Sequence, residues 1–259
     1  MDPVLWHSAV VLTVICLLGW WHQRGTGNAG HADVIWTFGL AGTASYYLLI
    51  GDGPVWPRLL AGVLIVIWSL RLGLHVWKRV RSEAEDGRYR AMRTAMGKRA
   101  NLGFVFFFLG QGLLAWLFAL PFWLIATQQE SPAIGLLIVA VLVGVMALLG
   151  EAVADRQLAA FRGRPENRGK TCRTGLWRYS RHPNYFFEWL HWFSYPLLAA
   201  GSAWAGWVWL TPALMLVFLW FVTGIPHTEK QALKSRGDDY RQYQRTTSPF
   251  IPWRPRNDY

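Results

Sequence analysis

Seven long apolar segments recur along the whole chain, and each is long enough to cross a lipid bilayer as a helix. Because a bilayer offers no water to backbone groups, apolar segments of this length fold as helices. The composition agrees, since 53% of the 259 residues are hydrophobic. We therefore predict an all-α, polytopic integral membrane protein with seven transmembrane helices in a single membrane domain over residues 1–259. The predicted spans are about 4–21, 31–50, 57–77, 102–127, 132–152, 184–200 and 204–226.

The basic residues are confined to a few connections between these segments. All but three of the 26 Lys and Arg residues lie in 78–99, 156–181 and 230–256. The turns at 51–57, 128–131 and 201–205 contain no Lys or Arg. Arg58 lies just beyond the first of them. Cytosolic loops of membrane proteins are enriched in Lys and Arg. The pattern predicts an outside N-terminus and a cytosolic C-terminus, and it explains the net charge of +11 without a nucleic-acid partner.

The first apolar segment follows Met1-Asp-Pro3 directly and lacks the basic residues that open a signal peptide. We therefore expect a retained span. The two cysteines, Cys16 and Cys172, fall in a span and a cytosolic loop, so we expect neither a disulfide nor a zinc site.

One polar face interrupts the sixth predicted span. Asn184, Glu188 and His191 follow His182 and Pro183 at a spacing that places all three on one side of a helix rich in Trp, Phe and Leu. Polar groups are costly inside a membrane unless they face a cavity or a ligand. This spacing predicts a functional face.

Other spans carry polar groups near their cytosolic ends. Asp33 opens the second span, either as a helix cap or as a functional carboxylate. Arg71 belongs to a stripe on the third span that either extends toward the headgroups or binds a long anionic ligand. That stripe consists of Trp68, Arg71, His75 and Lys78.

The fifth apolar segment runs on without a break signal to Arg162, with Glu151 and Asp155 on the same helical face. Gln111 is the one deeper polar residue, and it either bridges helices or lines a cavity. We expect the loops 78–101 and 153–183 and the tail 227–259 to form a vestibule with these stripes. Such a vestibule suits an amphipathic cofactor from the cytosol and a lipophilic substrate from the bilayer. The His spacing does not suit a metal, and no Gly-x-Gly-x-x-Gly motif is present.

The segment Gly175-Leu-Trp-Arg-Tyr-Ser-Arg-His-Pro-Asn-Tyr-Phe-Phe-Glu188 resembles the signature of the membrane steroid 5α-reductase family. Three further segments resemble its bacterial branch: Glu85-Asp-Gly-Arg-Tyr-Arg-Ala-Met-Arg93, Glu151–Leu158, and Asp239-Tyr-Arg-Gln-Tyr243 with Ser248-Pro-Phe-Ile-Pro252. The Arg-His-Pro-x-Tyr core alone is shared with isoprenylcysteine carboxyl methyltransferases. The resemblance spans most of residues 71–252 and implies a bacterial inner-membrane enzyme whose cofactor site faces the cytosol.

The resemblance also implies a reaction. NADPH would reduce a carbon–carbon double bond conjugated to a ketone, as in a 3-oxo-4-ene steroid, with hydride passing to the β-carbon. Asn184 and Glu188 would hold the nicotinamide end. Ribose and phosphates would be bound by Asp155, Arg162 and Arg173. The rest of the cofactor site would comprise Tyr179, Arg181, His182, Tyr185, Tyr240 and Tyr243, with Arg71 and Lys78 from the third span. We expect Trp36, Trp68, Gln111 and His191 to line the substrate cavity.

The chain departs from the animal enzymes where the substrate carbonyl binds. Those enzymes use a Gln-Glu pair and a Tyr. Here Asp33 is the nearest counterpart in place of the pair, and Trp68 takes the Tyr position if Arg71 matches the Arg that follows that Tyr. Asp33 and Glu188 are accordingly the predicted catalytic residues. An S-adenosylmethionine-dependent membrane methyltransferase of a lipid or prenylcysteine is the alternative, and a non-enzymatic lipid- or sterol-binding protein is a third reading.

Overall fold

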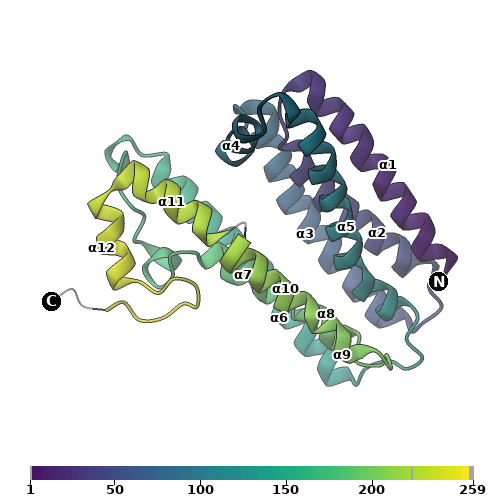
Figure 1. Ribbon diagram of the computed structural model, residues 1–259. Coiled ribbons are helices and arrows are strands. Elements are labelled where there is room, and N and C mark those ends of the chain that lie inside the picture. Colours follow the sequence, from purple (N-terminus) through teal and green to yellow (C-terminus); the bar gives the residue numbers. More distant parts are fainter. Residues whose placement is uncertain (1, 223, 257–259) are drawn as a thin grey trace. The chain divides into compact units, whose positions relative to one another are not determined.

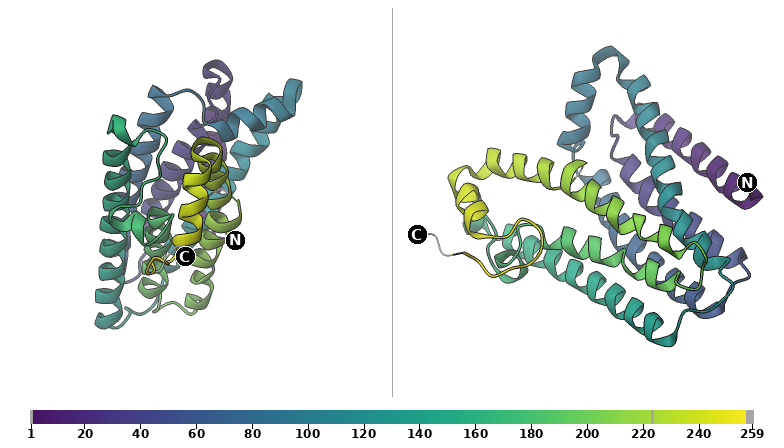
Figure 2. Two further views of the ribbon diagram at one scale, coloured as in Figure 1. Left: turned by 90° about the vertical axis from the view of Figure 1, so that its left-hand side faces the viewer. Right: turned by 60° about the horizontal axis from the view of Figure 1, so that its bottom comes forward.

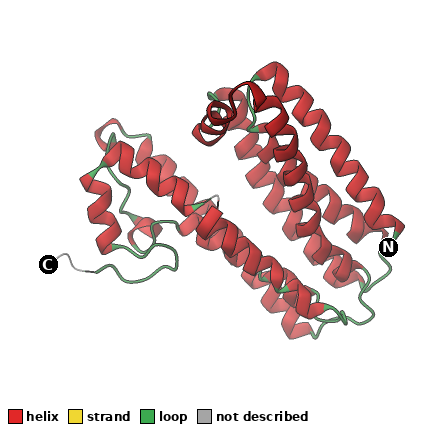
Figure 3. Ribbon diagram, in the orientation of Figure 1, coloured by secondary structure: helices red, strands yellow, loops and turns green. Residues whose placement is uncertain are grey.

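The structure is a computed structural model that describes residues 2–222 and 224–256. Helices dominate it, and no strand occurs in these two ranges (Figure 3). The chain divides into two compact units, of which unit 1 comprises 1–133 with 198–205, and unit 2 comprises 134–197 with 206–259. We describe each unit by itself.

Unit 1 is a bundle of four long helices with a short helix, α4, at one end (Figure 1). Its long helices and α4 are α1 (Pro3–Thr26), α2 (His31–Ile50), α3 (Val55–Ser82), α4 (Gly87–Met96) and α5 (Ala100–Ala126). A 3₁₀ turn, η1 (Gly97–Arg99), joins the last two. Helix α2 packs against α3 and α5, while α1 packs against α5.

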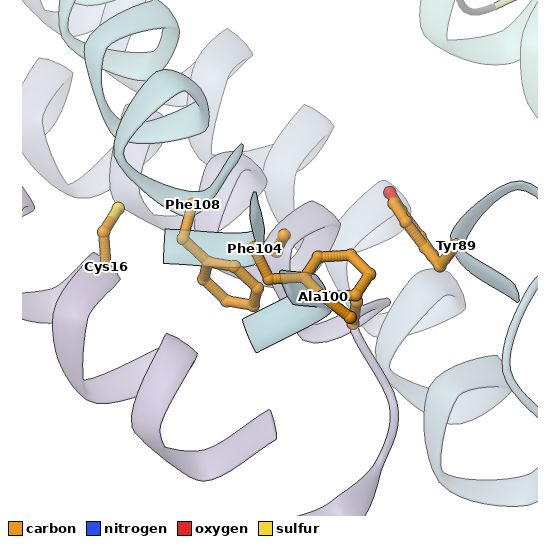
Figure 4. Close-up of a cluster of buried hydrophobic side chains, with 7 residues drawn as sticks. Cys16, Tyr89, Ala100, Phe104 and Phe108 are labelled. Carbon is orange, nitrogen blue, oxygen red and sulfur yellow. The ribbon is translucent and has the colours of Figure 1, made fainter. Parts of the chain in front are cut away.

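Close packing in unit 1 depends on small residues that face large ones. A Cβ atom at Gly73 would lie 2.5 Å from the ring of Phe38. At the α4 end, Phe104 and Phe108 of α5 are fully buried in a cluster with Cys16 and Tyr89 (Figure 4). These contacts bury apolar surface inside the bundle and fix α4 against it.

The three turns predicted to share one side of the membrane contact one another in unit 1. Gly53 N–H donates to Ala126 O at 2.8 Å. The Gln128 amide donates to Leu198 O at 3.0 Å and accepts from Gly201 N–H at 3.1 Å. This agrees with a common side for the turns.

Unit 2 pairs a long helix with several shorter ones. They are α6 (Ile134–Arg162), α7 (Pro183–His191), α8 (Ser194–Leu198), α9 (Ala205–Val208), α10 (Leu210–Val217), α11 (Ile225–Arg236) and α12 (Asp238–Thr246). A π-helical turn, η4 (Phe218–Val222), follows α10, and two 3₁₀ turns, η2 (Pro165–Asn167) and η3 (Gly175–Arg178), lie between α6 and α7. Helix α7 packs along α6. Helices α11 and α12 meet at a tight turn (Figure 2), where Gly237 has φ 53°.

The structure confirms that α6 continues without a break to Arg162. It divides the predicted span 184–200 into α7 and α8, which are separated at Trp192 and Phe193. Within the described part of the chain, five helical stretches are long and apolar enough to cross a membrane: Pro3–Thr26, Val55–Ser82, Gly87–Ala126, Ile134–Arg162 and Ala205–Arg236. These support an integral membrane protein, whereas the count of seven spans and the orientation stay predictions.

Candidate functional site

The signature segment begins with a 3₁₀ turn held against α6. Gly175 has φ 58°, a backbone conformation that glycine adopts without strain. Leu176 N–H donates to the Gln157 side chain at 2.8 Å, and the Trp177 indole donates to Ala154 O at 2.9 Å. The Gln157 side chain and the Ala154 carbonyl, about one helical turn apart on α6, thereby fix the segment that leads into α7.

Helix α7 starts immediately after the Arg-His-Pro core. His182 is the residue before the helix, and Pro183 occupies the first helical position, where its missing N–H costs nothing. The first turn closes with Phe186 N–H donating to His182 O at 3.1 Å. Arg181 and His182 are thus held at the end of a helix rather than within it.

Glu229 of α11 gathers the polar side chains of this region. Arg181 Nε lies 3.0 Å from Glu229 Oε1, and His182 Nε2 lies 3.3 Å from the same oxygen. The Tyr240 hydroxyl donates to Oε1 at 3.3 Å, and the Gln244 amide donates to Oε2 at 2.7 Å. We call these five residues the Glu229 cluster. It brings together Arg181, His182 and Tyr240, three residues of the predicted cofactor site.

The sequence analysis missed Glu229. It is the only acid among the charged residues of α11, which otherwise carries Lys230, Lys234 and Arg236. This isolation was the available signal. A single carboxylate in a basic segment is expected to form ion pairs with cations.

Burial sets the protonation of the Glu229 cluster. It lowers the pKa of His182, and the hydrogen bond and charge of Glu229 offset this only in part. Burial also raises the pKa of Tyr240, as does the Glu229 charge. At neutral pH a neutral His182 with its proton on Nε2 and a protonated Tyr240 therefore both donate to the carboxylate.

Two more of the predicted tyrosines are fixed nearby. The ring of Tyr185 stacks on His182 with centroids 5.3 Å apart, and its hydroxyl lies 3.0 Å from Thr228 Oγ1. The buried Tyr243 hydroxyl donates to Ser180 O at 3.1 Å and also to Trp177 O. Tyr179, in contrast, is 41% exposed.

An amide and a carboxylate meet where α6 and α7 lie side by side. Asn184 Nδ2 donates to Asp155 Oδ1 at 3.3 Å, and Asn184 Oδ1 accepts from Tyr185 N–H at 3.0 Å. Both side chains are half-buried. The predicted nicotinamide and ribose residues are therefore neighbours.

The predicted phosphate residues differ in their surroundings. Arg173 is paired with Asp239 at 2.9 Å and also donates to its backbone oxygen at 2.7 Å, so it connects the 163–182 loop to α12. Arg162 is exposed at the end of α6. A diphosphate requires uncommitted cations. The exposed cations are Arg162 at the end of α6 and, in the loop, Arg164, Arg168, Lys170 and Arg178.

Glu188 and His191 lie further along α7 and are buried. Glu188 Oε1 accepts from the Trp192 indole at 3.0 Å. His191 Nε2 lies 2.7 Å from the Tyr195 hydroxyl. The Glu188–Trp192 and His191–Tyr195 contacts both lie at the end of α7, where the predicted sixth span is interrupted.

In unit 1, Asp33 belongs to a cluster at the α4 end. Its carboxylate accepts from the Tyr89 hydroxyl at 2.5 Å and from Arg88 at 3.3 Å. The reading of Asp33 as a helix cap is wrong, since α2 begins at His31 after Gly30 and the Asp33 side chain reaches α4 instead. Tyr89 was quoted in the resemblance but not assigned to the site.

The other predicted residues of unit 1 lie along the bundle. Trp68 is fully buried and meets Trp36 edge to face, with centroids 5.7 Å apart. Arg71 and Gln111 are half-buried, whereas His75 and Lys78 are exposed. A vestibule that combines these residues with those of unit 2 remains a prediction.

The polar groups of unit 2 fit a dinucleotide. Ribose hydroxyls donate to carboxylates, carboxamides pair with amides, and phosphates accept from guanidinium groups. Asp155, Asn184 and the exposed Arg residues of the 163–182 loop supply these three kinds of group in one unit. Among the residues that the structure describes, no three His, Cys, Asp or Glu side chains are grouped to hold a metal. Cys16 and Cys172 are free, buried thiols.

Neither a curated protein nor a solved structure matches the chain. One family model does, over residues 19–247, under the description "Protein of unknown function (DUF1295)". The match includes the signature segment, α6, the Glu229 cluster and the Asp33 cluster. The chain is therefore a member of this family, which is related to the steroid 5α-reductases.

Proposed function

We propose that this protein uses NADPH to reduce a carbon–carbon double bond conjugated to a ketone in a lipophilic substrate, such as a 3-oxo-4-ene steroid. The observation that carries the proposal is the Asn184–Asp155 pair, which stands beside a cation-rich loop. The family relation to steroid 5α-reductases supports the same reaction class. The bacterial branch of that family and an inner-membrane location belong to the proposal.

Each part of unit 2 has a role in this proposal. When bound, NADPH supplies the hydride. Asn184 and Glu188 orient the carboxamide end, and Asp155 accepts from the ribose. Arg162 and its exposed neighbours neutralise the phosphates, while the Glu229 cluster holds the start of α7 in place.

The Asp33–Tyr89 pair is our candidate for the carbonyl end of the substrate. Tyr89 carries the proton in this pair, and Asp33 accepts it. A hydroxyl that turns from Asp33 to the substrate oxygen would stabilise the negative charge that develops there on hydride addition. Asp33 remains a catalytic residue of the proposal, with Tyr89 as the donor.

A direct assay separates the three readings of the sequence. The purified protein in lipid nanodiscs is given NADPH with tritium on C4 and testosterone, and in parallel a labelled methyl donor and a prenylcysteine. We expect tritium in the reduced steroid. Methyl transfer without enone reduction would overturn the proposal in favour of the methyltransferase. Binding of steroid without turnover or cofactor retention would favour a binding protein.

Glu188 offers a first test of the cofactor site. Glu188→Ala removes the predicted nicotinamide ligand, so we expect NADPH affinity to fall at least about tenfold, the loss of one good charged hydrogen bond. The protein should still insert into membranes. Fluorescence titration with NADPH measures the affinity.

The matched control for that test is Trp192→Phe. It removes the indole that donates to Glu188 but leaves the carboxylate. If Glu188 contacts the cofactor, the control binds NADPH nearly normally. Equal affinity of Glu188→Ala and the unaltered protein would remove Glu188 from the site.

A further inference from the structure

A non-helical segment follows α12, and the proposed reaction does not use it. Residues 247–256, here called the C-terminal strap, follow α12 and return to the signature segment. Arg181 N–H donates to Ser248 O at 2.8 Å, and Trp253 N–H donates to Tyr179 O at 2.9 Å. These two backbone bonds fix both ends of the strap.

The inner side of the strap is anchored by one aromatic ring. Phe250 is 2% exposed, and Ser180 Oγ donates to its backbone oxygen at 2.7 Å. Its ring lies 6.0 Å from Phe186, 5.6 Å from Trp189 and 5.5 Å from Trp220, measured between centroids. The strap is therefore held rigidly rather than trailing from the fold.

Those ring partners place the strap at a membrane boundary. Trp220 belongs to a helical stretch long and apolar enough to cross a bilayer. Phe186 lies within the first turn of α7 and Trp189 in its second, less than about 10 Å along the helix axis from Pro183. In the predicted spans 184–200 and 204–226, these rings fall toward the cytosolic ends, so the strap packs near the predicted membrane boundary.

The outer side of the strap has the composition of a membrane interface. Ile251 is 56% exposed and Trp253 is 72% exposed, although both are large and apolar. Arg254 and Arg256 follow immediately and are also exposed. Trp partitions to the headgroup level, and Arg extends from there to phosphate.

We propose that the C-terminal strap is an interfacial anchor that binds anionic lipid headgroups, with Ile251 and Trp253 inserted among the lipids and Arg254 and Arg256 paired with their phosphates. An anionic bilayer surface is the occupant, because Phe250, beside Ile251, packs on a ring of a helical stretch apolar enough to cross a bilayer, and the two charges that follow Trp253 are both positive. The anchor does not depend on the proposed reaction.

The test measures the depth of a nitroxide on the strap. The label is placed at Ile251→Cys in the full chain, after Cys16→Ala and Cys172→Ala remove the two native thiols. Nanodiscs of phosphatidylcholine with phosphatidylglycerol expose both membrane faces. Collision rates with oxygen, which enters lipid, and with a nickel chelate, which stays in water, report the depth. A label at Arg241→Cys on α12 is the exposed control.

We expect the label at 251 to favour oxygen over the nickel chelate several-fold more than the label at 241. Arg254→Gln with Arg256→Gln should remove this preference in anionic discs, since each cation near an anionic surface changes partitioning by roughly fivefold. The charge-matched control, Arg241→Gln with Arg245→Gln, should leave it unchanged.

Three results would overturn the proposal. One is equal access of the nickel chelate to the labels at 251 and 241. Another is the same depth in anionic and purely neutral discs. The last is protection of the label that rises with protein concentration rather than with anionic lipid, which would assign the strap to a second copy of the chain.

Discussion

Glu229 accepts four side-chain contacts, and their donors come from two parts of the chain far apart in sequence. Arg181 and His182 precede α7, while Tyr240 and Gln244 belong to α12. A carboxylate that compensates a largely buried guanidinium is worth more than one on the surface, because loss of one partner leaves the other charge unsolvated. Glu229 is therefore a positioning residue for the start of α7.

Glu229→Ala should lower the free energy of unfolding by about 2 kcal/mol, since several hydrogen bonds to a charged group are lost together. Glu229→Gln keeps an acceptor and should cost less. Thermal unfolding in nanodiscs measures both. Glu166→Ala, on the exposed turn η2, is the control. A loss no larger than that of the control would contradict this role.

The titration of His182 predicts a pH dependence. Its pKa in the folded protein is below the ordinary 6.5, so the unfolded chain binds the proton more readily. Stability is then fully present above about pH 6.5 and falls as the pH drops toward the folded value. The groups that face His182 are Arg181, Glu229 and the stacked ring of Tyr185.

His182→Asn should flatten the change in melting temperature between about pH 7.5 and pH 5, a range above that in which carboxyl groups mainly titrate. His75→Asn on α3 changes an exposed histidine and should leave the profile as it was. Identical profiles for His182→Asn and the unaltered protein would refute the prediction.

At the residue scale, sequence analysis identified residue types better than their partners. The Arg-His-Pro core predicted that Arg181 and His182 belong to the site. The partner of both lies 47 residues after His182, at a distance in sequence that no local pattern encodes. Asp33 shows the same limit, because its contact with Tyr89 depends on how α4 folds back on the bundle.

At the scale of elements, α6 and α7 meet at a glycine. A Cβ atom at Gly150 would lie 2.4 Å from the ring of Phe187, closer than any real contact. Small residues in a membrane helix let the neighbouring helix approach closely. The structure confirms this for Gly150, whereas a Cβ atom at Gly135 would meet nothing within 4 Å.

Gly150→Ala should therefore destabilise the protein by roughly 1–3 kcal/mol, since the ring of Phe187 or the helix axis has to shift. Gly135→Ala, on the same helix, should be neutral or slightly stabilising. Thermal unfolding of the two variants gives the comparison. A lower melting temperature for Gly135→Ala than for Gly150→Ala would refute the packing argument.

The sequence predicted where a helix ends when the helix is long and no turn residue interrupts it. The continuation of α6 to Arg162 was predictable, because no Gly, Pro or turn residue interrupts 151–162. The break after α7 was not, since Trp192 and Phe193 are as apolar as their neighbours. It coincides instead with buried polar contacts of Glu188 and His191, which hydropathy does not register.

At the scale of the whole molecule, the arrangement of turns agrees with the charge pattern. Within unit 1, turns that lack Lys and Arg contact one another, as in the bond from Gly201 to Gln128. The loop after α1 meets the segment after α3 at the other end, where Ala29 N–H donates to Glu85 at 2.9 Å. The turns that lack Lys and Arg were predicted from that pattern to share a side.

Labelling from one side of the membrane tests the predicted topology. Single cysteines at Asp52, Lys98 and Arg241, all exposed, are treated with an impermeant maleimide. We expect Asp52→Cys to react in intact cells and the other two only after permeabilisation. Reaction of Lys98→Cys and Arg241→Cys from opposite sides would exclude the predicted number of spans between them.

The Glu229 cluster also has a consequence for biosynthesis. Arg181 and His182 leave the ribosome well before the acceptor that they require, and Gln244 follows later still. Because membrane helices are delivered from the N-terminus onward, the start of α7 stays incomplete until α11 and α12 have been made. A chain that stops short of Glu229 would leave the charge of Arg181 uncompensated.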